Sequence, residues 1–305
     1  MKTYACVAAA VLAALASTGC SRPEVAAKAP TTASAPTPAL TEPVTHYALR
    51  GEVISVDVAR HVLVVKHEEI TGYMPGMTME FVVSAGDAAV AKPGQRIRAQ
   101  MIPSKDSDFR LEQIWPDDQV ATDTVAAVSN ALRQDTHNRG KEAYREIGET
   151  IPDFALYDQE GRVVQSARFR GKLIMLNFIY SRCPVATMCP ASTAKMMSTQ
   201  KLARDAGVPN LELISVSLEP SYDTPGVLKD YATTRGIDTS NFSFLTGPER
   251  AIADLLTQFG VIAEFKGGVL NHSLSTLLID ENGRIIHRAD GSQWEPREFI
   301  AKMTK

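Results

Sequence analysis

The stretch YSRCPVATMCPA, Tyr180 to Ala191, holds two cysteines whose type and spacing suit thiol or metal chemistry. Five residues separate Cys183 from Cys189, and a proline follows each of them. Two thiols held close together can form a disulfide, attack the disulfide of another protein, or bind a soft metal ion. On this stretch alone a static structural disulfide, a thiol–disulfide exchanger and a metal site all remain open.

The neighbouring sequence predicts how this cysteine pair is positioned. The apolar run KLIMLNFIY before it is typical of a strand buried on both faces of a sheet. Pro184 disfavours helical backbone at Cys183, whereas Pro190 suits the first turn of a helix that begins near Cys189. We therefore expect a loop between the cysteines that folds Cys183 back over the helix start, where backbone N–H groups favour a thiolate.

A second stretch, KHEEITGYMPGMTMEF, gathers methionines beside a histidine. Met77 and Met79 are two residues apart on an expected strand, so both side chains face the same side. Met74 precedes them, and His67 ends the strand before. Most methionines fill protein cores, but thioether and imidazole groups clustered so densely favour Cu(I) or Ag(I). The predicted ligands are His67, Met74, Met77 and Met79.

The elements that must hold these two stretches predict two domains. Residues 46–120 contain five alternating, β-branched segments separated by polar turns, which indicates a small closed barrel of the OB type. Residues 121–150 are polar and helical in pattern and form the predicted linker. From residue 151 to 305 strands alternate with helices, which indicates an α/β domain of thioredoxin type.

The first 45 residues indicate where the protein is located rather than how it folds. Residues 1–20 hold an apolar run too short to span a bilayer, followed by small residues ending at Cys20, as in a bacterial lipoprotein signal. An ordinary cleaved signal is the alternative. Residues 21–45, rich in Ala, Pro and Thr, predict a disordered tether. We expect a protein on the periplasmic side of a bacterial membrane, anchored by lipid on Cys20, and the net charge of −3 does not point to a nucleic-acid partner.

The second half of the chain resembles the Sco/SenC family of thioredoxin-fold copper chaperones. The resemblance runs from Ile151 to Lys305 and includes the cysteine stretch, SVSLEPSYDTPGVLKDYA and NHSLSTLLIDENGRI. It implies that Cys183, Cys189 and His272 bind copper, as Cu(I) and in a second state as Cu(II). It also implies that Cys183 and Cys189 are a redox pair able to form a Cys183–Cys189 disulfide.

Three positions depart from the family pattern. The family usually places three residues between the cysteines, and here there are five, which would loosen copper binding or favour thiol exchange. Asn271 stands before His272 where an aspartate is usual, so one negative charge is missing near the metal. Glu219 stands where the family has aspartate, while Asp223 agrees with it and is expected to organise its loop.

Residues 46–120 resemble the CusF-type periplasmic copper-binding domains through His67, Met77 and Met79. In a CusF-type domain of this family a tryptophan covers the metal, and here Met74 occupies that position. The resemblance implies a Cu(I) site in which Met74 is a fourth ligand, or one that is open on that side.

Together these features predict an exported Cu(I) chaperone. The family resemblance implies delivery to the dicopper centre in subunit II of cytochrome c oxidase or to another exported copper protein, or reduction of that subunit's cysteines. Two alternatives remain: a thiol–disulfide oxidoreductase with vestigial metal binding, and a protein that sequesters copper or silver for resistance. A flexible link between the domains would let the barrel pass copper to the cysteine site at high effective concentration.

Overall fold

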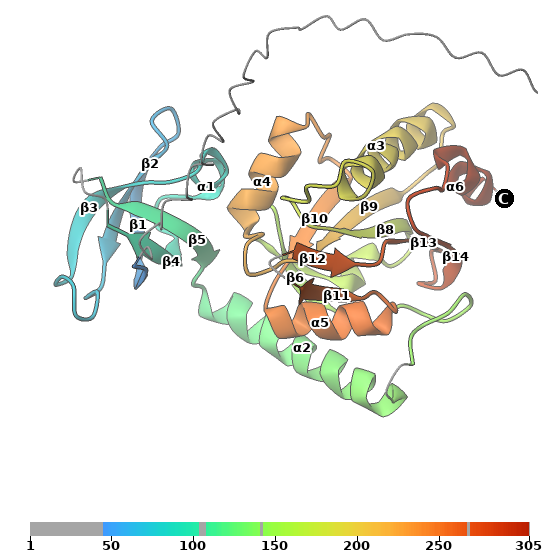
Figure 1. Cartoon of the computed structure of the whole chain (residues 1–305), viewed down its shortest axis with the longest axis horizontal. Helices are drawn as coiled ribbons and strands as arrows, with labels where there is room; N and C mark the ends of the chain where they lie inside the picture. The colour runs from blue at the N-terminus through green and yellow to red at the C-terminus, as the bar shows by residue number, and fades with distance from the viewer. Residues whose placement is uncertain (1–44, 104–107, 141–142, 267–268, 305) are drawn as a thin grey trace, which may run out of the picture. The chain divides into compact units, whose positions relative to one another are not determined.

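The computed structural model describes residues 45–103, 108–140, 143–266 and 269–304, which form a β-barrel followed by an α/β domain (Figure 1). The predicted signal, the lipidation of Cys20 and the tether lie outside the described residues. Among the helices that the structure describes, none is both long and apolar enough to cross a membrane.

The barrel confirms the five strands predicted from alternating hydrophobicity. Its strands close in the order β1-β2-β3-β5-β4, and all neighbours are antiparallel except β3 and β5. Alternate side chains fill the interior because successive residues of a strand point to opposite faces. The strands are β1 (Tyr47–Asp57), β2 (Val62–His67), β3 (Met77–Val82), β4 (Arg96–Ile102) and β5 (Arg110–Pro116).

A short helix, α1 (Ala85–Val90), follows β3 and was not expected. Its six residues are too few to show helical periodicity in the sequence. Ser84 caps it, because the Ser84 hydroxyl accepts a hydrogen bond from the backbone N–H of Asp87 at 3.0 Å. Asp87 is itself buried, which becomes important for pH dependence below.

The linker is helical only in its first part. Helix α2 (Gln119–Arg139) ends at Gly140, whose positive φ of 93° suits a helix end. The prediction of helical structure over residues 121–150 is wrong for Ala143–Glu146, which have no helical structure.

The buried side chain of Arg145 gives the reason for this break. Its guanidinium donates to Asp135 at 2.5 Å, to Gln258 at 2.7 Å and to the carbonyl of Thr150 at 2.5 Å. Its backbone N–H donates to the carbonyl of Gln258 rather than to a carbonyl of the same segment. These bonds, and the buried Leu132 in the core of the α/β domain, fix α2 against that domain. The first part of the link, Gln119–Arg139, is therefore a helix packed on the α/β domain, and the flexibility that the handoff hypothesis assumed stays a prediction.

The α/β domain has the layered arrangement expected for a thioredoxin-like fold. Its sheet has the order β14-β13-β8-β9-β10-β6-β7, with β8, β9 and β10 parallel. Figure 1 shows α3, α4 and α6 on one face of this sheet and α5 on the other. The strands are β6 (Ala155–Asp158), β7 (Val163–Gln165), β8 (Leu173–Ile179), β9 (Leu211–Ser217), β10 (Phe242–Thr246), β13 (Ser275–Ile279) and β14 (Ile285–Asp290), and the helices are η1 (Ser166–Phe169), α3 (Cys189–Asp205), α4 (Pro225–Thr234), α5 (Glu249–Gln258) and α6 (Pro296–Met303).

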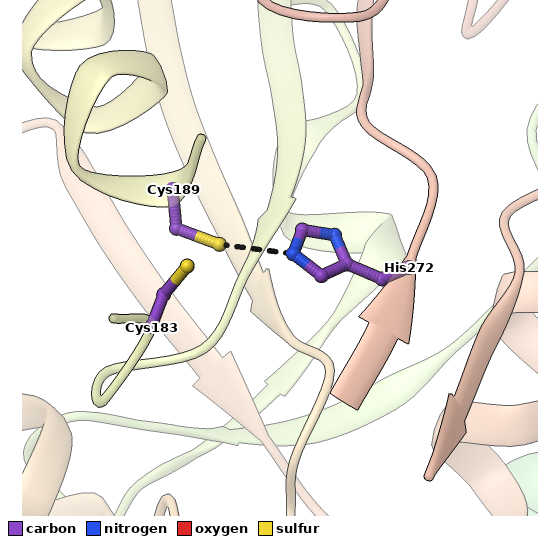
Figure 2. A group of neighbouring side chains, drawn as sticks. All are labelled: Cys183, Cys189 and His272. Carbon is purple, nitrogen blue, oxygen red and sulfur yellow. Dashed lines mark hydrogen bonds between the residues drawn. The ribbon is translucent and has the colours of Figure 1, made fainter. Parts of the chain in front are cut away.

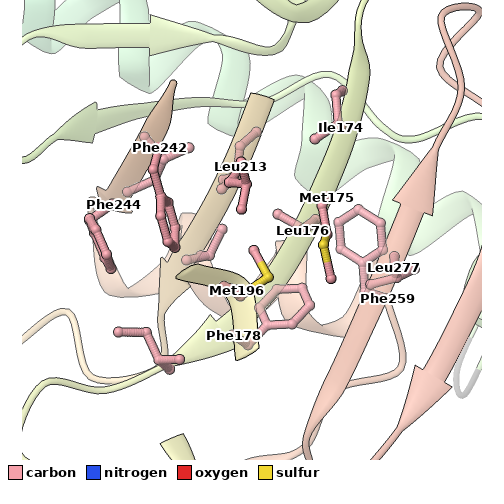
Figure 3. Close-up of a cluster of buried hydrophobic side chains, with 14 of the residues drawn as sticks. Ile174, Met175, Leu176, Phe178, Met196, Leu213, Phe242, Phe244, Phe259 and Leu277 are labelled. Atoms are coloured by element: carbon pink, nitrogen blue, oxygen red, sulfur yellow. The ribbon is translucent and has the colours of Figure 1, made fainter. Parts of the chain in front are cut away.

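The central strands of this sheet are buried along their whole length. Every residue of β8, β9 and β10 is buried, as expected for strands covered on both faces (Figure 3). Helix α3 adds Met196 to this core next to Phe178 of β8. The end of β8 is consequently a rigid platform, and the cysteine loop starts from it.

A two-stranded hairpin supplies the distant histidine. It consists of β11 (Ala263–Lys266) and β12 (Val269–His272), in which Ala263 pairs with His272. The hairpin is pinned at its base, because Ile262 N–H donates to the Ser273 hydroxyl at 2.9 Å and Ser273 N–H donates to the Ile262 carbonyl at 3.0 Å. The sequence did not reveal this element because each of its strands has only four residues.

Candidate metal centres

The two cysteines and His272 meet at the end of β8. Cys183 lies on the loop after this strand, Cys189 is the first residue of α3, and His272 ends β12 (Figure 2). Their ligand atoms, two sulfurs and one imidazole nitrogen, all lie within 4.8 Å of one another. Among the residues that the structure describes, no other group of three His, Cys, Asp or Glu ligand atoms is gathered in this way. The loop predicted between the cysteines is thus confirmed.

Both cysteines are free thiols in this structure, so the predicted disulfide is not formed here. They differ in environment: Cys189 is fully buried, whereas Cys183 is partly exposed. Burial raises the pKa of the Cys189 thiol to about 12, and the neighbouring Cys183 adds to this. Without a metal ion, Cys189 therefore keeps its proton at neutral pH.

His272 is oriented to present one nitrogen to the sulfurs. Its Nδ1–H donates to the carbonyl of Ser273 at 3.1 Å, so Nε2 carries the lone pair. Nε2 lies 3.6 Å from the Cys189 sulfur, close enough to accept the thiol proton. Burial lowers the pKa of His272, against the opposing effect of the Ser273 carbonyl. The neutral imidazole is the form that binds a metal ion.

Two buried carboxylates hold the residues just before Cys183. The side chain of Asp223 accepts hydrogen bonds from the N–H and the hydroxyl of Ser181 and from the hydroxyl of Ser217. Glu219 forms a bidentate ion pair with Arg182, and the Nε–Oε2 distance is 2.8 Å. Both carboxylates come from the segment between β9 and α4, so this segment anchors the cysteine loop. The loop-organising role predicted for Asp223 is confirmed.

A further pair of hydrogen bonds fixes the start of α3, which carries Cys189. Asn177 of β8 donates to the Ser192 hydroxyl at 3.0 Å and accepts from the Ser215 hydroxyl at 2.6 Å. Ser192 lies on the first turn of α3, one turn after Cys189. The bond therefore ties the helix start to the two central strands, and with it the position of the buried thiol.

The barrel site is built around His67, which is almost completely buried. Its Nδ1–H donates to the carbonyl of Glu68 at 2.7 Å, and its Nε2 is buried without a hydrogen-bond partner. A buried imidazole nitrogen without a partner is costly, and a metal ion would satisfy it. In the β2–β3 register His67 is paired with Met77, and Val65 with Met79.

Two tight backbone contacts shape the segment that carries the methionines. A Cβ on Gly76 would lie 3.1 Å from the His67 carbonyl oxygen, so glycine lets the Met-Pro-Gly-Met segment return against β2. Met74 is placed by a turn in which Ile70 and Met74 bond each other's backbone in both directions. Met74 and Met79 pack partly buried against the barrel core, and Met77 is half exposed at the end of its strand.

One residue that contacts the cysteine site was missed by the sequence reasoning. Tyr180 is the last residue of the apolar run before the loop, and it is buried. Its ring meets the His272 ring edge-to-face, with centroids 5.4 Å apart and planes at 89°. Its position in the sequence could have identified it, because it is a tyrosine three residues before the candidate ligand Cys183.

Comparisons with known proteins match both halves of the chain. Residues 142–305 match the SCO1/SenC family, and residues 46–116 match the family described as copper binding periplasmic protein CusF. A SCO2-like protein of Rickettsia typhi is 31% identical over 163 residues, which are 50% of this chain and 76% of that protein.

Solved structures match the same half. A SCO1/SenC family lipoprotein from Bacillus anthracis is 26% identical, with a TM-score of 0.49, and the match covers 53% of this chain and 98% of that one. ScoI of Bradyrhizobium japonicum, solved with copper bound, is 27% identical with a TM-score of 0.43, covering 52% of this chain and 98% of that one.

Proposed function

This chain belongs to the SCO1/SenC family, and we propose that it is an exported copper chaperone carrying Cu(I) on Cys183, Cys189 and His272. The observation that carries the proposal is the convergence of two sulfurs and the free imidazole Nε2 within 4.8 Å. Three such soft or intermediate donors suit Cu(I), which accepts low coordination numbers. Copper is here the cargo of the protein rather than a resident cofactor.

We propose a second Cu(I) site in the barrel, with His67, Met74, Met77 and Met79 as ligands. The buried, unpartnered Nε2 of His67 and its pairing opposite Met77 support it. The match of residues 46–116 to a copper-binding periplasmic family agrees with this choice of metal. Thioether and imidazole donors at a half-exposed edge suit reversible capture of the ion.

The proposed destination is the dicopper centre in subunit II of cytochrome c oxidase, or another exported copper protein. Membership of the SCO1/SenC family supports this target. The proposed location, on the periplasmic side and anchored by lipid on Cys20, rests on the sequence of residues 1–20 and on the periplasmic CusF-like match.

The decisive test is the stoichiometry of Cu(I) binding to the full, reduced chain in detergent, measured anaerobically against a competing chelator. We expect two ions per chain, one lost in Cys183→Ser and the other weakened in Met77→Leu. Met101→Leu, which alters a fully buried methionine of the barrel core, is the matched control. A reduced chain that takes up no Cu(I) at micromolar concentration would contradict the proposal.

The asymmetry of the thiols supports a second function, reduction of disulfides. The accessible Cys183 thiolate would attack a substrate disulfide, forming a mixed disulfide and releasing one substrate thiolate. The Cys189 thiol would then attack the Cys183 sulfur while its proton moves to His272 Nε2, forming the internal disulfide and releasing the second thiolate. Insulin reduction with and without bound Cu(I) tests this activity, and rapid turnover with only weak copper binding would favour it over the chaperone.

Silver or copper resistance without a target is tested by growth of a deletion strain under metal stress.

A further inference from the structure

A cavity of about 240 Å³ is lined by residues that neither candidate copper site uses. Figure 1 shows α2 running alongside α5, and residues of both helices line the cavity together with Tyr157 of β6. These elements belong to one compact unit, Val44–Lys305. Because none of the proposed copper ligands lines it, the cavity is a separate feature of the chain.

Three arginine side chains bring unpaired positive charge to this cavity. Arg98 of β4, Arg133 of α2 and Arg250 of α5 line it and are exposed. None of their guanidinium groups forms an ion pair or a hydrogen bond with a described residue. The carboxylate among the lining residues is Asp254, whose pKa is raised by burial and lowered by the charges of Arg133 and Arg250. With three cations and one anion around it, the cavity favours a negatively charged ligand.

The start of α5 adds free backbone donors. Its N-cap is Pro248, and no side chain caps the first turn. The N–H groups of Arg250 and Ala251 have no acceptor among the described residues, and both residues line the cavity with Pro248. An uncapped start of a ten-residue helix favours an anion through these N–H groups and the helix dipole. Glu249, the acidic residue of this turn, does not line the cavity.

A buried tyrosine hydroxyl without a partner is the independent sign of a ligand. Tyr157 is only 3% exposed and lines the cavity, so its accessible part opens into it. Its hydroxyl makes no hydrogen bond to a described residue. A buried donor without a partner is costly, and an anion in the cavity would accept its hydrogen bond.

The remaining wall of the cavity is apolar and suits a compact hydrocarbon group. Val125 and Ala126 of α2 and the ring of Tyr157 form part of it. An apolar cavity of about 150 Å³ is enough to hold a benzene ring. This cavity therefore has room for one ring and a charged head group.

We propose that this cavity binds a small organic anion, with its carboxylate or phosphate held by Arg133, Arg250 and the start of α5. The planar guanidinium group matches the oxygens of either head group. The apolar body of the ligand lies against Val125 and the ring of Tyr157. The inference does not rest on the proposed function, because no copper ligand takes part in it.

The test uses the full, reduced, copper-free chain and three probes followed by fluorine NMR. The probes are para-fluorophenyl phosphate, para-fluorophenylacetate and the neutral para-fluorobenzyl alcohol. We expect at least one of the two anions to bind, and the alcohol to bind at least about tenfold more weakly, because it lacks the charge-assisted hydrogen bonds. The anion with the higher affinity identifies the head group that the site prefers.

Substitutions of the charged residues should move the affinity in opposite directions. Arg133→Gln and Arg250→Gln should each weaken binding of the anion about tenfold, because each removes one charge-assisted hydrogen bond. Asp254→Asn should strengthen it about threefold, because the opposing carboxylate is lost. Arg204→Gln is the matched control: Arg204 is an exposed arginine of α3 that pairs with Asp238 and does not line the cavity.

Tyr157→Phe removes only the unpartnered hydroxyl and should weaken binding of the anion about fivefold, the ratio for one lost hydrogen bond. Failure of both anions to bind at millimolar concentration would overturn the inference, and so would equal binding of the alcohol. Equal affinities of wild type, Arg133→Gln and Arg250→Gln would overturn it as well. No readout involves copper, so failure of this inference and failure of the proposed function are distinguished.

Discussion

At the scale of single residues, the two candidate centres use the same device. In His67 and in His272 the Nδ1–H donates to the carbonyl of the following residue, Glu68 or Ser273. This fixes the tautomer and leaves Nε2 as the free nitrogen. The barrel and the α/β domain have different folds, so the shared arrangement follows from what a histidine ligand requires.

This arrangement predicts that His272 and His287 behave differently when substituted. Both lie in the α/β domain, and His287 also has a buried Nε2 without a partner, against the ring of Phe299. His272→Gln should weaken Cu(I) binding at the cysteine site at least about tenfold, because an oriented nitrogen donor is lost. His287→Gln should leave it unchanged, because His287 is not part of the three-residue group. Chelator competition measures both, and equal losses would contradict the assignment of His272.

A buried carboxyl outside both sites predicts a pH dependence of stability. Burial raises the pKa of Asp87 from 3.8 to about 6, with a smaller contribution from Asp230 and against the hydrogen bond from Ser84. Between pH 3.8 and about pH 6 the Asp87 carboxyl is protonated in the folded chain and ionised in the unfolded chain. The contribution of Asp87 to stability is therefore complete below about pH 4 and is lost as the pH rises through 6, by about 3 kcal/mol.

Asp87→Asn removes this titration. Relative to wild type, the variant's free energy of unfolding in urea should rise between pH 4.5 and pH 7.5 and then stay constant. Asp57→Asn, which changes an exposed carboxylate of the same barrel, should show no such rise. A difference between wild type and Asp87→Asn that does not vary with pH would rule out the buried proton.

At the scale of elements, the segment between β9 and α4 determines where Cys183 lies. Asp223 is fully buried and accepts from the N–H and hydroxyl of Ser181, two residues before the cysteine. Asp223→Asn replaces one acceptor oxygen with an NH₂ group that faces a donor. We expect a loss of about 2 kcal/mol of unfolding free energy and faster alkylation of Cys183 as its loop loosens.

The control for this prediction is Asp205→Asn. Asp205 ends α3 and pairs with Lys201 at the surface, where an ion pair contributes little. It should change neither the urea midpoint nor the alkylation rate. An unchanged alkylation rate in Asp223→Asn would show that the carboxylate does not restrain the cysteine loop.

Much of this arrangement could be predicted from the sequence because it depends on local patterns. Alternating hydrophobicity defined the five barrel strands, and the continuous apolar run defined β8. The prolines after Cys183 and Cys189 were enough to predict a loop followed by a helix start. The break after Gly140 was missed because it depends on Arg145 bonding Gln258, 113 positions away in the chain. The hairpin that carries His272 and the contacts of Tyr180 likewise depend on tertiary packing, which local pattern does not report.

At the scale of the whole molecule, the two proposed Cu(I) sites on one chain predict cooperation between them. If the barrel captures copper for the cysteine site, Met77→Leu combined with Met79→Leu should slow loading of Cys183 and Cys189 when copper is limiting. The reason is that an ion captured on the same chain is present at high effective concentration. Protection of the two thiols from alkylation, followed by mass spectrometry, measures the loading. Met101→Leu is again the control, and unchanged loading in the double variant would contradict a handoff.

The different exposure of the two thiols also affects how the cysteine pair reacts with oxidants. Cys183 is partly exposed and Cys189 is fully buried, so peroxide reaches Cys183 first. The sulfenic acid formed there has the Cys189 thiol within 4.8 Å and condenses with it, releasing water and forming a disulfide. That step competes with irreversible conversion to sulfinic acid. A short burst of oxidant should therefore leave the pair in a form that a cellular reductant can restore.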